Sequence, residues 1–446
     1  MTLIPFLLQV ILVLVYTQGL LELTGIPSIA IKLAIEGPLI LLLLNLLTRP
    51  AIRLAPGWGF VLFFFLSSLA SGMVSGDGIM SAVLYSRTLI YAYIIYWAVY
   101  ATPLHNLDRS KLLRWIVWLW TFQIAITVLK LGVFGSRQEG IVGSITSTGG
   151  VAGTAFPLLV TAFAMTWFLL NDHSPKWLIL TLASGLVGYA SGKRAIYFYL
   201  PALYFVILAG YISKTRESMS LSRILVWVIV LTLGIPFFSY GIRHTGGITL
   251  NQEQAGASEQ VRYAIDAARQ YESITVDGQT GGRTATSRRV LDWLSSVDPS
   301  EALLGYGPGS LMGEKRAMKK VRFFYGMVGW AHDAVSIGIP GMLAQIGFYL
   351  LLWIRVIQKG KLHGAPQDWR ALQWGTSLSF LVFFLLYFTY CDASALRGWF
   401  AFVHLAAVGL ILSPVNSWLP IPPPALSPAQ TQRAPTRLSA SSRPPP

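Results

Sequence analysis

The chain has 446 residues, of which 54% are hydrophobic and only 12% are charged, and its formal net charge is +15. Soluble proteins carry roughly 25% charged residues, so this composition excludes a soluble globular protein and indicates a polytopic membrane protein. In such a protein, Lys and Arg gathered on the cytoplasmic side account for the positive charge, and no nucleic-acid partner is expected. The single cysteine, Cys391, excludes an intramolecular disulfide and a cysteine-cluster metal site.

Apolar runs recur along the chain at the length that a membrane-spanning helix needs, about 20 residues. The first run begins at Leu3 without a basic segment or a cleavage site, so we interpret it as a helix rather than a cleaved signal peptide. The sequence predicts an all-α integral membrane protein of about 12 transmembrane helices. Their approximate ranges are 3–21, 29–47, 58–75, 79–101, 112–133, 150–170, 176–191, 194–212, 223–240, 334–356, 371–391 and 396–413.

The short loops between these runs differ in their content of Lys and Arg. Most of the basic residues fall on one side: Arg49, Arg53, Arg109, Lys111, Arg114, Lys176, Lys214, Arg216, Arg223, Arg355, Lys359, Lys361 and Arg370. The opposite short loops carry few: Lys130, Arg137, Lys193, Arg194 and Arg397, with Lys32 and Arg87 close by. The positive-inside rule then predicts that both termini are cytoplasmic. Long loops are exempt from this rule, so the basic segment 241–332 is expected on the external, periplasmic side.

These assignments divide the chain into four parts. Residues 1–240 hold helices one to nine, 241–332 form the external loop, 333–413 hold helices ten to twelve, and 414–446 form a cytoplasmic tail. The tail is rich in proline and has no acidic residue, a composition that cannot bury a core and predicts disorder. Docking of a partner is the alternative interpretation of the tail.

The external loop is predicted to be mostly helical. Residues 253–273 have helical composition, and a second helix is expected from an N-cap at Thr286 or Ser287 to just before Pro299. The glycine-rich segment LLGYGPGS then indicates a tight turn. Residues 313–326 combine Lys and Arg on one face with Phe323 and Phe324, which suggests a short helix on the membrane surface.

Two arginines in or beside this loop are candidate phosphate ligands, because guanidinium is planar, permanently charged and able to bind bidentately. Arg289 is expected in the first turn of its helix, where free N–H groups favour oxyanions. Arg194 lies at the external mouth of the eighth helix, and snorkelling to the interface is its alternative role. A solvated surface position is the alternative for Arg289.

His332 precedes the tenth apolar helix, and a neutral imidazole there could serve as a general base. A structural or capping role is the alternative. Asp333 beside it would orient the imidazole or cap the helix. The six histidines show no pairing at metal-ligand spacing, and the sequence contains neither a P-loop nor a D-x-D motif, so we expect no metal and no nucleotide cofactor.

Four motifs occur in a fixed order: Ser191-Gly-Lys-Arg194, Ser287-Arg-Arg289-Val-Leu-Asp-Trp293, Leu304-Gly305-Tyr-Gly307-Pro-Gly309, and Ala331-His332-Asp333 followed by an apolar helix with Gly347. Together with the long loop and the helix number, they resemble the O-antigen ligase and O-antigen polymerase family of bacterial envelope membrane proteins. Asp333 stands where that family usually has asparagine. The stretch from His332 to Gly347 is also slightly longer than usual.

The resemblance implies an inverting, metal-independent glycosyltransferase of the GT-C type in the bacterial inner (plasma) membrane. Its donor would be a glycan linked to polyprenyl diphosphate, and its acceptor hydroxyl would belong to a glycan, a lipid or a protein. Arg289 and Arg194 would hold the diphosphate, and His332 would help to deprotonate the acceptor. Gly305, Gly307, Gly309 and Asp333 would support them. The products would be lipopolysaccharide or exopolysaccharide.

Two other functions fit a protein with this many helices. A secondary transporter of a small anion would share the topology, although transporters concentrate charges and broken helices near the middle of the bilayer. A structural protein of envelope assembly would not require Arg289 or His332. Motifs that are concentrated in an external loop favour glycan transfer over both alternatives.

Overall fold

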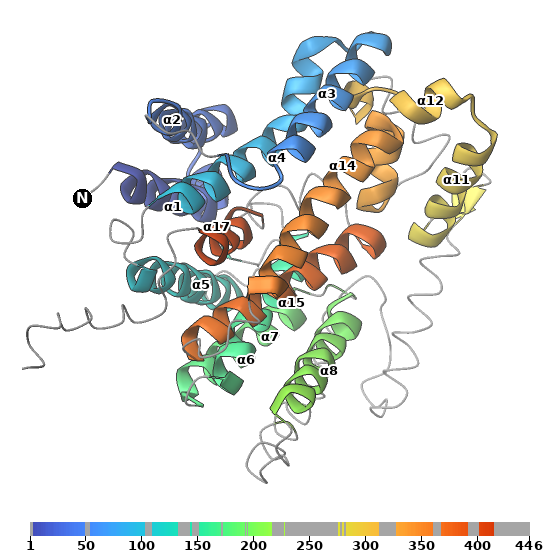
Figure 1. Ribbon diagram of the computed structural model, residues 1–446. Helices are drawn as coiled ribbons and strands as arrows, with labels where there is room; N and C mark the ends of the chain where they lie inside the picture. The colour runs from blue at the N-terminus through green and yellow to red at the C-terminus, as the bar shows by residue number, and fades with distance from the viewer. Residues whose placement is uncertain are drawn as a thin grey trace, which may run out of the picture.

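The structure is a computed structural model, and it describes residues 3–49, 54–102, 109–132, 143–144, 151–170, 173–191, 193, 195–215, 227, 275–276, 279–280, 282–311, 327–359, 367–390 and 401–413. Helices dominate these residues (Figure 1). The only sheet among them pairs two antiparallel strands of two residues each, β1 (Thr275–Val276) and β2 (Gln279–Thr280). The predicted helical class is therefore confirmed.

The helices coincide with the predicted apolar runs wherever those runs are described. They are α1 (Leu3–Leu23), α2 (Ser28–Leu47), α3 (Trp58–Val74), α4 (Gly78–Ala101), α5 (Arg109–Gly132), α6 (Ala152–Leu170), α7 (Pro175–Ala190), α8 (Ile196–Thr215), α14 (Gly329–Lys359), α15 (Gln367–Thr389) and α17 (Ala401–Leu412). The loop segment holds α11 (Arg283–Ser296), α12 (Pro299–Leu304) and the 3-10 turn η2 (Pro308–Leu311).

Among the described residues, seven helices are long and apolar enough to cross a membrane: α1, α2, α4, α5, α6, α14 and α15. Shorter apolar helices lie in α3, α7, α8 and α17. The surface of α2 shows how such helices meet lipid, since Ile29 and Leu33 are 68% and 62% exposed. Side chains of this kind are stable at a surface only when hydrocarbon covers them. The chain is a helical membrane protein, and the number of twelve spans stays a prediction.

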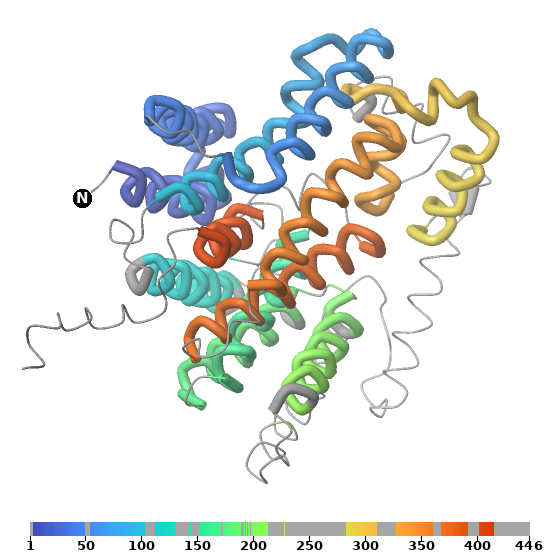
Figure 2. Tube along the Cα trace, in the orientation of Figure 1, coloured from blue at the N-terminus to red at the C-terminus, as the bar shows by residue number. Residues whose placement is uncertain are grey.

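Helices α6 and α17 are the most enclosed of the described helices. Almost all side chains of α6 are buried, and α7, α8 and α15 pack around it. Helix α14 crosses the molecule from the α12 end to the α6 end and packs against α3 and α15 (Figure 1, Figure 2). Because α14 begins beside the loop helices, its first turns lie where the loop residues can reach them.

One ion pair lies midway along two of these helices. Arg87 of α4 donates through Nη1 to Oε1 of Glu36 of α2 over 3.1 Å. Each charge would cost several kcal/mol alone in hydrocarbon, and the pairing offsets much of that cost. Other charged residues within the long helices include Lys32 of α2, Lys130 of α5 and Asp333 of α14.

Several predictions fall outside the described residues. They are the ninth apolar run 223–240 apart from Trp227, the helix 253–273, the surface helix 313–326, the tail 414–446 and the side chain of Arg194.

Candidate functional site

His332 and Asp333 lie inside the first turn of α14, so the expectation that His332 precedes this helix is wrong. The helix begins at Gly329, and the His332 amide already donates to the Val328 carbonyl at 2.9 Å. The helix starts earlier than the apolar pattern indicates. The residues between Gly329 and the first helix breakers, Gly338 and Pro340, all permit a helix. Both side chains are buried, with 2% of His332 and none of Asp333 exposed.

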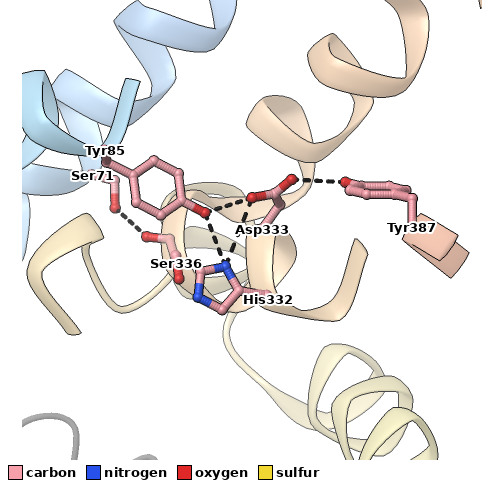
Figure 3. Close-up of polar contacts among 6 residues, drawn as sticks. All are labelled: Ser71, Tyr85, His332, Asp333, Ser336 and Tyr387. Atoms are coloured by element: carbon pink, nitrogen blue, oxygen red, sulfur yellow. Dashed lines mark hydrogen bonds and ion pairs between the residues drawn. The ribbon is translucent and has the colours of Figure 1, made fainter. Parts of the chain in front are cut away.

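The Asp333 carboxylate is held by two tyrosines from other helices. Tyr85 of α4 donates to Oδ1 at 2.5 Å, and Tyr387 of α15 donates to Oδ2 at 2.8 Å (Figure 3). The carboxylate does not cap the helix, since it lies beyond the first N–H groups and faces these hydroxyls. A buried carboxylate is tolerated when its oxygens accept such bonds. Asp333 therefore joins three helices at one point.

The Tyr85 hydroxyl also orients the imidazole of His332. Its oxygen lies 3.3 Å from Nδ1, and the two rings stack with their planes 4° apart. A tyrosine hydroxyl has one proton, and the short contact directs that proton to Asp333. We assign the hydrogen to Nδ1, because the tyrosine oxygen can then accept it. In a neutral ring this assigns the lone pair to Nε2, on the far side from Tyr85 (Figure 3).

Helix α14 is broken one turn after this pair, and the glycine-rich turn fills the break. Gly338 has non-helical angles (φ 76°, ψ 173°), and Pro340 has no N–H for the Ser336 carbonyl. Tyr306 N donates to Val335 O at 2.8 Å, and Gly307 N donates to Ser336 O at 3.1 Å. Ser71 of α3 adds a bond to Ser336 O at 3.0 Å (Figure 3). The freed carbonyls thus bind the turn to α14.

Close approach explains the glycines at this junction. Gly305 (φ 70°, ψ −171°) lies in a backbone region that is essentially restricted to glycine, and a Cβ there would be 2.7 Å from the Gly338 nitrogen. A Cβ on Gly307 would collide with Asp77 and Ser75. Gly309 N donates to the Asp77 carboxylate at 2.8 Å. All three predicted glycines thus have structural roles, whereas Asp77 and Ser71 were not predicted.

Helix α11 begins at Arg283, so the predicted N-cap at Thr286 or Ser287 is wrong. The Thr286 hydroxyl donates back to the Gly282 carbonyl at 2.7 Å, which a helical residue can do. Arg289 consequently lies in the middle of the helix and has no free helix N–H groups beside it. The proposed oxyanion site at a helix N-terminus is therefore absent at Arg289.

Helix α11 nevertheless packs beside the first turn of α14. Val290 and Trp293 form a buried cluster with Val328, Ala331 and Val335. Trp293 also stacks on Tyr306 of the turn, with ring centroids 5.2 Å apart. Arg289 is adjacent to Val290, and Ala331 is adjacent to His332, so this cluster holds the two predicted residues on neighbouring elements. Leu291 of α11, by contrast, is 55% exposed.

Arg283 is a second cation at this end of the molecule that the motifs did not indicate. Its guanidinium lies over the ring of Tyr390, 4.1 Å from the centroid. Tyr390 packs edge-on against Tyr199 of α8, whose hydroxyl is 2.8 Å from Thr389 Oγ1. Arg283, the first residue of α11, is therefore connected through Tyr390 to the start of α8 and the end of α15. Arg194, two residues before α8, lies outside the described residues.

The aromatic partners were missed because tyrosines within apolar runs are indistinguishable in pattern from packing residues. The described part of the chain contains no group of three His, Cys, Asp or Glu residues that could hold a metal ion. The chain matches no protein-family model and no curated protein.

Proposed function

We propose that this protein transfers a glycan from a polyprenyl-diphosphate carrier to an acceptor hydroxyl at the external face of the bacterial inner membrane. The reaction would be that of an O-antigen ligase or a polysaccharide polymerase, and it would invert the anomeric carbon. The acceptor would be a glycan, a lipid or a protein. The ordered motifs are the basis for the proposed reaction class, and the contacts around His332 support the proposed site.

The observation that carries this proposal is the relay from Asp333 through Tyr85 to His332. The tyrosine hydroxyl donates to the carboxylate and accepts from Nδ1, over 2.5 Å and 3.3 Å. A base is effective when a second group fixes its tautomer and its direction. Here the relay leaves Nε2 as the basic atom, and the buried carboxylate stabilises the imidazolium that forms.

The proposed transfer step needs no cofactor. The acceptor oxygen attacks the anomeric carbon and gives its proton to Nε2 of His332. The bond from that carbon to the diphosphate oxygen breaks on the opposite face, and the diphosphate leaves with the electron pair. Departure of such a group requires preorganised positive charge. Arg289 on α11 is the proposed source of that charge within the described residues.

We include Arg283 in the proposed diphosphate site, together with Arg194, which the motif resemblance adds. Tyr199, Tyr390 and Arg283 connect the ends of α8, α15 and α11. A lipid-linked diphosphate would approach along these helix ends, with its hydrocarbon among the apolar side chains. The distribution of Lys and Arg supports an external location for this end, with both termini in the cytoplasm.

The decisive experiment is transfer by the purified protein from a synthetic lipid-diphosphate glycan, measured with and without EDTA. We expect product with inverted anomeric configuration, and an unchanged rate when EDTA is present. Intact donor after long incubation with lipid, glycan and protein acceptors would refute the proposal. Loss of transfer in EDTA that Mg²⁺ restores would refute its metal-independent form.

Two structural features favour the transporter alternative enough to require its own test. Broken helices and membrane-embedded charges are common in secondary transporters, and α14 is broken at Gly338 while Arg87 pairs with Glu36. The break, however, is filled by the 305–307 backbone, and the two charges neutralise each other. Uptake of a small anion into proteoliposomes without glycan transfer would establish transport instead.

A further inference from the structure

A cavity of about 730 Å³ lies among α5, α6, α7, α15 and α17, remote from His332. Asp368 lies on its rim and Tyr387 binds Asp333, and these two residues lie near opposite ends of α15. Nineteen helical residues correspond to about 28 Å, close to the thickness of a bilayer core. The cavity therefore occupies the opposite end of the bundle from the candidate active site.

Most of the residues that line the cavity are apolar, and four of them are tryptophans. The tryptophans are Trp118, Trp120, Trp167 and Trp177. Trp167 and Trp177 stack with centroids 5.3 Å apart, and Trp120 packs on Phe163 at 5.6 Å. Trp118 is 56% exposed, so this wall opens onto the outer surface of the helices, where lipid lies. Cavities of roughly 300–1,000 Å³ with apolar walls are typical of ligand sites.

Three charged side chains form the rim of the same cavity. Arg114 lies in the second turn of α5, Lys176 in the first turn of α7, and Asp368 in the first turn of α15. Lys176 Nζ lies 5.5 Å from the Trp177 ring centroid, which places one cation directly above the aromatic wall. Helix starts of this kind lie at the membrane–water boundary, at the depth of lipid headgroups.

We propose that this cavity binds an aminophospholipid of the surrounding membrane, of the phosphatidylethanolamine type. Its acyl chains lie against the tryptophans, its phosphate faces Arg114 and Lys176, and its ammonium group faces Asp368. Two cations and one carboxylate complement a headgroup that carries one phosphate and one ammonium. A phospholipid without an ammonium group would lack the contact with Asp368, so the cavity should bind it less tightly. The site is independent of the glycan-transfer proposal.

The test uses the full-length protein in detergent, mixed with equal amounts of dioleoyl phosphatidylethanolamine and dioleoyl phosphatidylglycerol. Native mass spectrometry counts the lipids retained on each chain. We expect one phosphatidylethanolamine to be retained in preference to phosphatidylglycerol. Asp368→Asn should weaken phosphatidylethanolamine binding about fivefold and remove the preference, because an exposed ion pair contributes up to about 1 kcal/mol.

Two variants separate a headgroup site from a general effect of charge. Lys176→Gln should weaken the binding of both lipids. Arg370→Gln removes an exposed cation two residues from Asp368 that does not line the cavity, and it should change neither. The proposal is overturned if the wild type retains no phospholipid, if it retains phosphatidylglycerol equally well, or if Arg370→Gln matches Lys176→Gln.

Discussion

Tyr85 and Asp333 are 248 residues apart in the chain, and the Tyr85 hydroxyl donates to Asp333 Oδ1 over 2.5 Å. This bond connects α4 to the start of α14. It also fixes the hydrogen on Nδ1 of His332, because the same tyrosine oxygen accepts from that atom. The contact thus links the stability of the helix bundle to the chemistry of the candidate base.

Replacing the shared acceptor should destabilise the bundle. In Asp333→Ala, the hydroxyls of Tyr85 and Tyr387 lose their acceptor, and each unsatisfied buried group costs about 1–3 kcal/mol. We expect a clear fall in the midpoint of thermal unfolding in detergent. Asp333→Asn keeps one acceptor oxygen and should lose less. Asp292→Ala, at an exposed position on α11, serves as the control and should leave the midpoint unchanged.

Removal of the candidate base should abolish most of the transfer activity. General-base catalysis contributes about 10²- to 10⁴-fold, so His332→Ala should reduce kcat by that factor. His173→Ala alters an exposed histidine in the turn before α7 and should leave kcat unchanged. Wild-type turnover by His332→Ala protein would eliminate His332 as the base.

Two tyrosine variants distinguish orientation of the base from simple stabilisation. Tyr85→Phe and Tyr387→Phe each remove one hydrogen bond to Asp333, worth about 1 kcal/mol, and we expect Tyr85→Phe to lose somewhat more stability because it also removes the contact with His332. Only Tyr85 also contacts His332. Tyr85→Phe should therefore reduce kcat at least tenfold more than Tyr387→Phe, an order-of-magnitude expectation for a misoriented base. Equal effects of both variants on kcat would contradict the relay.

A methyl group at the junction of the turn with α14 should disrupt the site. Gly305→Ala puts a Cβ against the Gly338 nitrogen and forces a backbone conformation that is essentially restricted to glycine, so we expect a cost above ~3 kcal/mol. Gly76→Ala has a similar φ, 74°, but open space around its Cβ, and should cost about 1 kcal/mol. Unfolding midpoints and transfer rates should separate the two variants.

Neutralising the cation on α11 should affect the departure of the diphosphate. Removal of one stabilising donor typically costs about 10²- to 10³-fold in kcat, and Arg289→Gln should show a loss of this size. Arg288→Gln changes the neighbouring exposed arginine and should have little effect. If both variants lose activity equally, Arg289 acts only through the general charge of the loop.

Much of the candidate site was visible in the linear pattern. The glycines at 305, 307 and 309 predicted a tight turn, and the turn is present, with positive φ at Gly305 and Gly307. The start of α11 was mispredicted, because Thr286 resembles a cap but bonds within the helix to Gly282. Local capping patterns are ambiguous where a threonine can donate to a carbonyl four residues earlier.

The sequence by itself determined the helical membrane class and the approximate positions of the described apolar helices. Twenty apolar residues in hydrocarbon must satisfy their own backbone hydrogen bonds, and only a helix does this within one segment. Tertiary structure alone decided that Tyr85 and Tyr387 meet Asp333, and that the turn at Tyr306 fills the break before Pro340. Such contacts join residues far apart in the chain, and hydropathy carries no information about which apolar helix packs against which.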